Sequence, residues 1–205
     1  MTARVVPDGP AGRDEAAAVL AAGGVVGLPT DTVYGIAVAL ATPGGVERLF
    51  EIKRRPPDKG IVLLIDDLAQ VAERVTRTAA AEALRGLWPG GLTLVLPAVA
   101  GGTIAVRVPD HAAPRALARA VGPLPTTSAN LSGSPDARSA GEVAAALGDR
   151  LDLILDGGPS PGGVPSTVVE CSGGTARILR AGAIPPETLD EQLRAGAIPL
   201  SDGGS

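Results

Sequence analysis

Soft metal ligands are nearly missing from this 205-residue sequence, which has one cysteine, Cys171, and one histidine, His111. A single cysteine excludes an intramolecular disulfide. A zinc site with one cysteine and one histidine would need carboxylates to complete it, which is an uncommon arrangement. We therefore predict no metal site formed by the protein alone, and a reduced, cytoplasmic protein.

Aromatic residues are equally scarce, with one tryptophan, one tyrosine and one phenylalanine. The core must therefore consist of valine, leucine, isoleucine and alanine, and a surface that stacks nucleic-acid bases on aromatic rings is disfavoured. The formal net charge of −4 argues against a broadly basic face. No apolar run approaches membrane length and the N-terminus lacks the apolar core of a signal peptide, so we expect no membrane association.

The order of apolar segments predicts the fold. At 45% hydrophobic residues, the chain can bury one substantial core. Residues 14–24 read as an alanine-rich helix and residues 25–29 as a buried strand, whereas "LTLVLP" and "TIAVRVP" read as a hairpin around two glycines. Helices and strands alternate early and hairpins follow. We predict one α/β domain over residues 1–198, a twisted mixed β-sheet flanked by helices, and a disordered tail over 199–205.

Polar residues mark three expected helix starts. Thr42 is expected to be the N-cap of a helix that ends in basic residues. Asp66 is expected to cap a helix that runs through Val75. Ser139 and Glu142 have the spacing of a capping box.

The segment "PTDTVYG" follows the first buried strand and carries Thr32 and the only tyrosine, Tyr34. Its hydroxyls could hold a small polar substrate. The alternative is a loop whose threonine and aspartate side chains satisfy backbone groups.

The segment "FEIKRRPPDKG" contains both lysines of the chain, Lys53 and Lys59, beside Arg54 and Arg55. Lysine binds phosphate as a point charge, whereas the arginine fork grips two oxygens. The segment could therefore hold a triphosphate, although the sequence has no Walker-type loop. The alternative is a solvated basic helix end that interacts favourably with the helix dipole.

The segment "PTTSANLSG" offers the hydroxyl of Ser128 and the carboxamide of Asn130. No acid or base lies near them in the sequence, and His111 reads as a helix entry. We therefore interpret Ser128 as a ligand-binding hydroxyl and not as a nucleophile.

Two further features bear on a binding site. Residues 157–170 form a Gly/Pro-rich segment too long for a simple connection, which is typical of a cover or a binding wall. Arg107 and Arg180 interrupt apolar strands. An arginine on a buried strand face needs an anionic partner, whereas one on an outer face needs none.

Seven motifs in this order resemble the YrdC/Sua5 family of L-threonylcarbamoyladenylate synthases over about residues 23–184. They are "PTDTVYG", "KRRP", "WPGGLTLVL", "AVRVPDH", "TSANLSG", "DGG...PSTVVE" and "ILRAGAI". The resemblance implies a YrdC/RibB-like fold of the short type and a reaction that joins L-threonine, bicarbonate and ATP into threonylcarbamoyl-AMP. Pyrophosphate would be released, Mg²⁺ would accompany ATP, and the product would feed the t6A modification of tRNA by a downstream transferase.

The resemblance also implies roles for individual residues. Lys53, Arg55, Ser128 and Asn130 would be catalytic. Thr32, Tyr34, Arg107 and Ser166 would bind the threonine substrate. Arg55, Lys59, Thr103, Asn130 and Arg180 would bind ATP.

Two other functions remain open from the sequence. A YrdC-like domain could bind structured RNA, although the acidic composition and the few aromatic residues argue against it. A paralogue of the YciO type would share the fold and act on another substrate.

Overall fold

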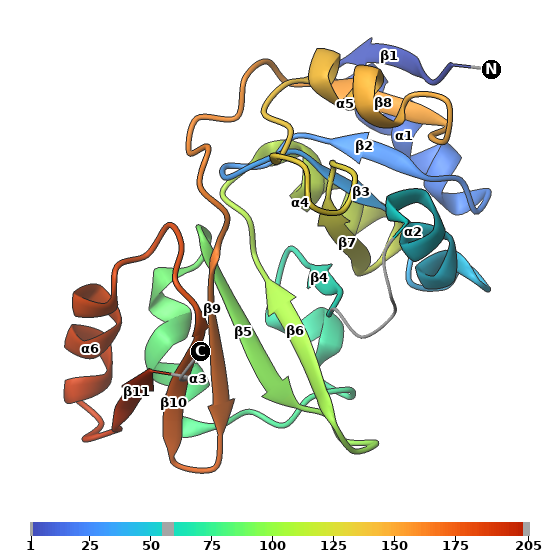
Figure 1. The fold of residues 1–205 in the computed structure, drawn as a ribbon. Helices are drawn as coiled ribbons and strands as arrows, with labels where there is room; N and C mark the ends of the chain where they lie inside the picture. Colours follow the sequence, from blue (N-terminus) through green and yellow to red (C-terminus); the bar gives the residue numbers. More distant parts are fainter. Residues whose placement is uncertain (1, 55–59, 203–205) are drawn as a thin grey trace.

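The computed structural model describes residues 2–54 and 60–202 (Figure 1). Within these residues, no helix is both long and apolar enough to cross a membrane. Eleven strands of the described residues form one mixed sheet in the order β1-β8-β2-β3-β7-β4-β6-β5-β9-β10-β11. The strands are β1 (Arg4–Pro7), β2 (Val26–Leu28), β3 (Gly35–Ala37), β4 (Val62–Leu64), β5 (Leu92–Pro97), β6 (Thr103–Arg107), β7 (Leu124–Ser128), β8 (Leu153–Asp156), β9 (Thr167–Ser172), β10 (Thr175–Arg180) and β11 (Leu200–Asp202).

In the described part of the chain, six α-helices and two short 3₁₀ helices flank this sheet. The sequence predicts a sheet flanked by helices but no 3₁₀ helix. The α-helices are α1 (Pro10–Ala21), α2 (Gly45–Lys53), α3 (Ala79–Leu84), α4 (Ala112–Val121), α5 (Ala140–Leu147) and α6 (Pro186–Arg194). The 3₁₀ helices are η1 (Leu68–Val71) and η2 (Arg85–Leu87). Figure 1 shows α3 and α6 beside the strands β5, β9 and β10, and α5 beside β8.

Three apolar clusters make up the core. One cluster packs α3 and α6 against β5, β9 and β10, a second packs α1 and α4 against β2 and β8, and a third packs α2 and α5 against β3 and β8. All three are dominated by aliphatic side chains, as the shortage of aromatic residues predicts. Tyr34 is the exception, because it is fully buried in the third cluster.

Two hairpins confirm the reading of the later strands. β5 and β6 pair antiparallel around the two glycines at 101 and 102, and β9 and β10 pair antiparallel around those at 173 and 174. In β5, alternate residues such as Leu94 face the core, whereas Thr93 lies on the opposite face. This alternation determines which side chains of the hairpin reach the cleft described below.

Two of the three predicted helix starts are wrong. α2 begins after Gly44 and not at Thr42, because Gly44 adopts a left-handed conformation with φ of 68°. Asp67, and not Asp66, caps the 3₁₀ helix η1, which ends at Val71. Asp66 instead accepts hydrogen bonds at 2.7 Å from Arg115 and from Arg119.

The third helix start is confirmed in part. Ser139 is the N-cap of α5, and its Oγ accepts from the backbone N–H of Glu142 at 3.2 Å. The Glu142 carboxylate accepts from the backbone N–H of Arg138 at 2.6 Å, one residue before the position that a capping box requires.

The expected disordered tail does not begin at residue 199. Leu200–Asp202 form β11, which pairs parallel with β10. Leu200 also packs against the core cluster of α3 and α6. Backbone pairing and apolar contact therefore order this segment, and residues 203–205 lie outside the described part of the chain.

Candidate active site

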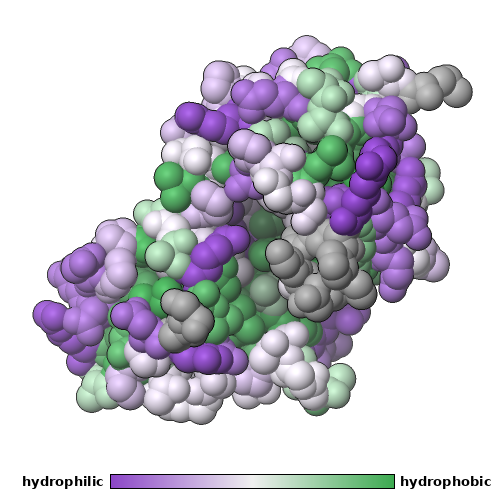
Figure 2. Space-filling view, viewed as in Figure 1, coloured by the Kyte–Doolittle hydropathy of each residue, from purple (hydrophilic) through white to green (hydrophobic). Residues whose placement is uncertain are grey.

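A cleft opens on the face of the sheet that carries Thr93 and Arg107. It contains a cavity of about 190 Å³ and an adjoining groove of about 630 Å³. Thr93, Arg180 and Val62 line both spaces. Figure 2 shows hydrophobic side chains exposed at the middle of this face, where the molecule is hollowed. A cavity of this size suits one small metabolite, and the groove suits a larger ligand.

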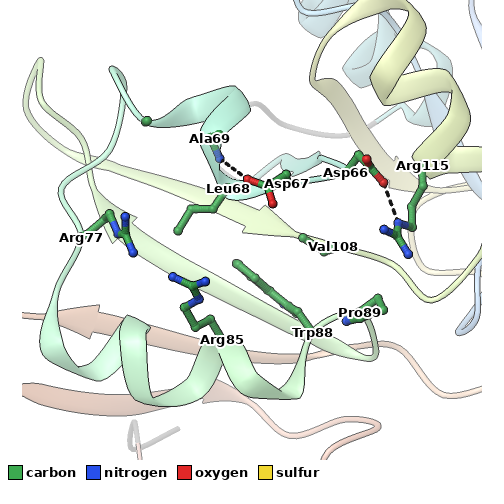
Figure 3. A pocket seen from close by; sticks show the side chains of 11 residues that line it. Asp66, Asp67, Leu68, Ala69, Arg77, Arg85, Trp88, Pro89, Val108 and Arg115 are labelled. Atoms are coloured by element: carbon green, nitrogen blue, oxygen red, sulfur yellow. Dashed lines mark hydrogen bonds and ion pairs between the residues drawn. The ribbon is translucent and has the colours of Figure 1, made fainter.

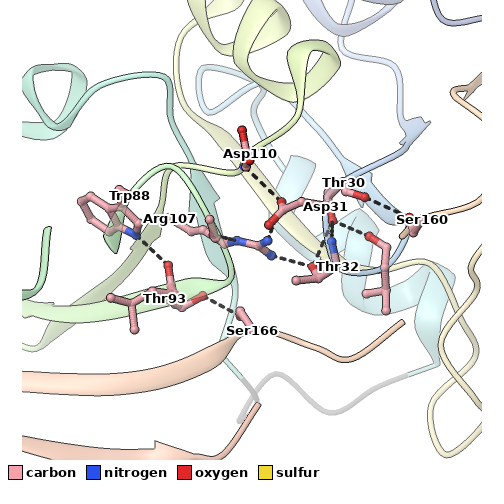
Figure 4. Close-up of polar contacts among 12 residues, drawn as sticks. Thr30, Asp31, Thr32, Trp88, Thr93, Arg107, Asp110, Ser160 and Ser166 are labelled. Atoms are coloured by element: carbon pink, nitrogen blue, oxygen red, sulfur yellow. Dashed lines mark hydrogen bonds and ion pairs between the residues drawn. The ribbon is translucent and has the colours of Figure 1, made fainter. Parts of the chain in front are cut away.

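Arg107 is the central cation of the cavity and is only 5% exposed. Its guanidinium donates from Nε to the Gly90 carbonyl at 2.9 Å, from Nη1 to Oγ1 of Thr32 at 2.8 Å, and from Nη2 to Oδ1 of Asp31 at 2.6 Å (Figure 4). Burial lowers the pKa of Arg107, and the Asp31 carboxylate opposes that shift. Arg107 therefore lies on a buried face, and Asp31 is its anionic partner.

The loop between β2 and β3 holds Thr32 in place through its own side chains. Oγ1 of Thr30 lies 3.0 Å from Oγ1 of Thr32, accepts from the Thr32 backbone N–H at 3.1 Å and donates to the Val33 carbonyl at 2.7 Å. Both threonines are buried. Both interpretations of this segment therefore apply, because the hydroxyls satisfy backbone groups and also line the cavity.

The Gly/Pro-rich segment packs against the loop between β2 and β3 and forms a wall there. Ser160 Oγ donates to the Thr30 carbonyl at 3.0 Å, and the backbone N–H groups of Gly162 and Gly163 donate to the carbonyls of Asp31 and Thr32 at 3.2 and 2.8 Å. A side chain at position 162 would place its Cβ 2.6 Å from the Asp31 carbonyl oxygen. Only glycine allows this close approach.

Tyr34 also anchors this wall. Its hydroxyl donates to the Gly158 carbonyl at 2.7 Å and accepts from the Gly157 N–H at 3.1 Å. Burial raises the pKa of Tyr34, so the phenol stays protonated and can make both bonds. Tyr34 therefore lines the cavity, but its hydroxyl is already hydrogen-bonded to the backbone of the Gly/Pro-rich segment.

A second polar cluster contains Lys53, Ser128 and Asn130. Lys53 Nζ lies 2.7 Å from Asn130 Oδ1, 2.6 Å from the Ser128 carbonyl oxygen and 3.1 Å from Ser128 Oγ. Ser128 Oγ donates to Asn130 Oδ1 at 2.7 Å. No lysine lies near Ser128 in the sequence, whereas the fold brings Lys53 within hydrogen-bond distance of the Ser128 hydroxyl as a donor.

Ser166 and Arg180 form a third group at the boundary between cavity and groove. Arg180 Nη2 donates to the Ser166 carbonyl at 2.7 Å and lies 3.3 Å from Ser166 Oγ. Ser166 Oγ and Thr93 Oγ1 are 2.8 Å apart (Figure 4). Thr103 begins β6 and lines the groove with Arg180, so it does not join the group around Arg107 at the other end of that strand.

Two predicted phosphate ligands, Arg55 and Lys59, lie outside the described residues. Gly60, which follows them, lines both the cavity and the groove. Among the described residues, no group of three or more histidine, cysteine, aspartate or glutamate side chains could hold a metal ion. The described side chains therefore do not fit a Mg²⁺ ion held by the protein alone.

Asp31, Thr30 and Thr93 belong to the site but are not among the individual residues that the sequence predicts for it. Asp31 and Thr30 belong to the segment that supplied Thr32. Thr93 is fully buried within the apolar segment "LTLVLP". The Thr93 hydroxyl in an otherwise apolar strand could have indicated a site residue, because a buried polar group needs a hydrogen-bond partner.

Comparisons with known proteins agree on the family of this chain. The Sua5_yciO_yrdC family model, described as Telomere recombination, matches residues 18–182. The chain is 39% identical over 190 residues to the threonylcarbamoyl-AMP synthase of Bacillus subtilis, covering 86% of this chain and 55% of that protein. It is 37% identical over 181 residues to the threonylcarbamoyl-AMP synthase of Xanthomonas campestris, covering 82% and 96%.

A solved structure of Pyrococcus abyssi Sua5 complexed with L-threonine superposes with a TM-score of 0.86 at 31% identity, covering 97% of this chain and 62% of that one. The chain thus spans about half the length of the Bacillus relative and somewhat more of the Pyrococcus protein. The matched residues include all three polar groups of the cleft. On these grounds the chain belongs to the Sua5/YciO/YrdC family.

Proposed function

We propose that this protein is an L-threonylcarbamoyladenylate synthase, which makes threonylcarbamoyl-AMP from L-threonine, bicarbonate and ATP and releases pyrophosphate. The observation that carries the proposal is the buried Arg107 guanidinium beside the Thr32 hydroxyl in a cavity of about 190 Å³. The names of the Bacillus and Xanthomonas relatives support the activity. The protein would act in the cytoplasm, and its product would feed the t6A modification of tRNA.

L-Threonine would occupy the cavity. Its α-carboxylate would meet the guanidinium of Arg107, which is the residue type that best matches a carboxylate. Its hydroxyl would exchange hydrogen bonds with Thr32 or Ser166, whose side chains line the cavity. The aliphatic wall of Val33, Val62 and Leu64 would contact its methyl group. The L-threonine bound to the Pyrococcus protein supports this assignment.

ATP would lie in the groove. Arg180 and Thr103 line it, and Gly60 marks where the basic segment with Arg55 and Lys59 rejoins the described chain. Ser128 lines the cavity, and Lys53 and Asn130 contact Ser128 through hydrogen bonds, so this group would meet the reacting atoms. Mg²⁺ would be held mainly by the phosphates of ATP and would supply neutralising positive charge.

The reaction requires two bonds to form. The amine of L-threonine first condenses with bicarbonate, which gives a carbamate and water. A carbamate oxygen then attacks the α-phosphorus of ATP, and the bond to the β-phosphate oxygen breaks to release pyrophosphate. Carbamate and triphosphate are both anionic, so the cations around the cleft would offset their repulsion. The wall formed by the Gly/Pro-rich segment would limit access of water to the labile carbamate.

The direct test is pyrophosphate release from ATP and bicarbonate, with and without L-threonine. We expect release that depends on L-threonine. L-Valine, which lacks the hydroxyl, should be rejected by roughly 10⁴-fold, because it cannot form the hydrogen bond that the L-threonine hydroxyl would form with the buried Thr32 or Ser166. Equal pyrophosphate release with the two amino acids, or release independent of both, would contradict the proposal and favour a YciO-type relative with another substrate. Salt-sensitive RNA binding without ATP turnover would instead favour the RNA-binding module.

A further inference from the structure

A second cavity lies behind the cleft and plays no part in the proposed reaction. Its volume is about 410 Å³, which lies within the usual range for small-molecule sites of about 300–1,000 Å³. Figure 3 shows it between η1 and the α3–η2 segment, with the Trp88 ring between Arg85 and Val108. Val108 lines this cavity, whereas its neighbour Arg107 faces the cleft.

One end of the cavity carries Arg77 and Arg85. Both guanidiniums bind the same carboxylate: Arg77 donates to one oxygen of Glu82 at 2.5 Å and Arg85 to the other at 2.9 Å. Among the described residues, Glu82 is their only hydrogen-bond partner. Several N–H groups of each fork therefore remain available, and the side chains are about half exposed, 55% and 49%. The Asp67 carboxylate also acts on Arg77 through its charge. An anion at this end of the cavity would therefore be bound through the N–H groups of the two forks that Glu82 does not occupy.

The middle of the cavity is an aromatic surface. Trp88 is the only tryptophan of the chain and lines this space. Its indole N–H donates to the Leu92 carbonyl at 2.7 Å. Because the polar edge of the ring is satisfied inside the protein, the ring offers the cavity a surface for stacking.

Acidic residues limit the charge of a ligand. Asp66 is paired with Arg115, and the Asp67 carboxylate accepts from the Ala69 backbone N–H at 2.8 Å. Both carboxylates line the cavity. They can accept hydrogen bonds from ligand hydroxyl or amino groups, and they would repel a polyanion such as a triphosphate.

We propose that this cavity is a second binding site, for a small molecule that combines a planar aromatic ring with one anionic group, the chemistry of a nucleoside monophosphate. The anion would bind Arg77 and Arg85, and the ring would stack on Trp88. The proposal does not rest on the proposed function, because binding here requires neither turnover nor L-threonine.

The test measures the fluorescence of Trp88, which lines the cavity, while the full chain is titrated with AMP, adenosine or inorganic phosphate. Calorimetry of the same titrations measures binding without relying on fluorescence. We expect a saturable response to AMP and affinity at least about tenfold weaker for adenosine, which lacks the anion. Arg77→Gln and Arg85→Gln should each weaken AMP binding by a similar factor. Arg194→Gln, an exposed arginine of α6, is the matched control and should bind AMP like the wild type.

A control must separate this cavity from the cleft, because Trp88 is close to both. Gly90 accepts from Arg107 at 2.9 Å, two residues after Trp88. AMP in the cleft would therefore also reach the fluorophore. If Arg180→Gln removes the AMP response while Arg77→Gln and Arg85→Gln keep it, the ligand lies in the cleft and the proposal is wrong. The proposal is also wrong if neither fluorescence nor calorimetry detects binding of AMP at millimolar concentration. Circular dichroism must show in the same experiment that the protein is folded.

Discussion

Lys53 Nζ lies 2.7 Å from Oδ1 of Asn130, although 77 residues separate them in the sequence. The same ammonium lies 2.6 Å from the Ser128 carbonyl oxygen and 3.1 Å from Ser128 Oγ. Among the described residues, each of these three oxygens can accept a hydrogen bond from a protonated lysine. A general base needs a free lone pair, so this geometry favours Lys53 as a donor to oxygen and Ser128 as a binding hydroxyl.

The first prediction concerns Ser128. Ser128→Ala should slow pyrophosphate release by the contribution of about one hydrogen bond to a charged group, roughly 1.5–3 kcal/mol or 10- to 150-fold. Asn130→Ala should behave similarly, and the double variant should fall short of additivity, because both side chains belong to one network. Intact-mass spectrometry during turnover is the check on mechanism. A stable adduct mapping to Ser128 would establish it as a nucleophile and contradict this role.

The second prediction concerns Asp31, the anionic partner of Arg107. Asp31→Asn keeps a similar shape but leaves the buried guanidinium without its countercharge, which should destabilise the free protein by about 1–3 kcal/mol. L-Threonine should then raise the thermal midpoint of this variant more than that of the wild type, since its carboxylate would supply the missing charge.

Asp110→Asn is the matched control for Asp31, because Asp110 contacts Asp31 through its backbone N–H and not through its carboxylate. This variant should have wild-type stability and a wild-type response to L-threonine. If L-threonine stabilises Asp31→Asn less than the wild type, the substrate carboxylate does not bind at Arg107.

The third prediction concerns His111, the N-cap of α4. Its Nδ1 accepts from the Ala113 N–H at 3.1 Å, which only the unprotonated nitrogen can do. Burial lowers the pKa of His111; among nearby charges, Asp8, Asp31 and Asp110 raise it and Arg13 lowers it. The unfolded chain, with a pKa of about 6.5, therefore binds a proton more readily than the folded chain. The contribution of His111 to the stability of the fold is therefore complete above that pH. It is lost as the pH falls through the pKa of His111 in the folded protein.

Comparison with His111→Ser isolates this contribution, because serine is a good N-cap and does not titrate in this range. Urea unfolding between pH 7.5 and pH 5 should show a larger loss of stability for the wild type than for His111→Ser. At pH 7.5, His111→Ala should cost about 1 kcal/mol through loss of the cap. Parallel pH profiles for the wild type and His111→Ser would show that His111 does not titrate with folding.

The fourth prediction concerns Cys171. The side chain is fully buried, and burial raises the pKa of its thiol to about 12. Since the thiolate is the reactive form, the native protein should resist a thiol-specific reagent at pH 8. The unfolded chain should take up one equivalent rapidly under the same conditions. Rapid stoichiometric labelling of the native protein would show that β9 opens readily in solution.

Local chemistry made much of the fold predictable. Apolar alternation and paired glycines located the β5–β6 and β9–β10 hairpins. The helix starts were less predictable, because a cap depends on backbone conformation as well as residue type. Gly44, in a left-handed conformation, caps α2 in place of the predicted Thr42. Asp67 caps η1 in place of the predicted Asp66, whose carboxylate pairs with arginines of α4. The strand β11 depended on contacts with β10 that no local signal encodes.

By itself, the sequence determined the family resemblance, the aliphatic core and the residue types available for an anionic substrate, since motif order and composition are properties of the chain. It could not decide which of these residues meet. Arg107 reaches Asp31 across 76 residues, and Lys53 reaches Ser128 across 75. Those contacts exist because β3 pairs with β7, and β4 pairs with both β7 and β6, which brings distant loops to one cleft. Only long-range strand pairing, which depends on the whole folded sheet, fixes such distances.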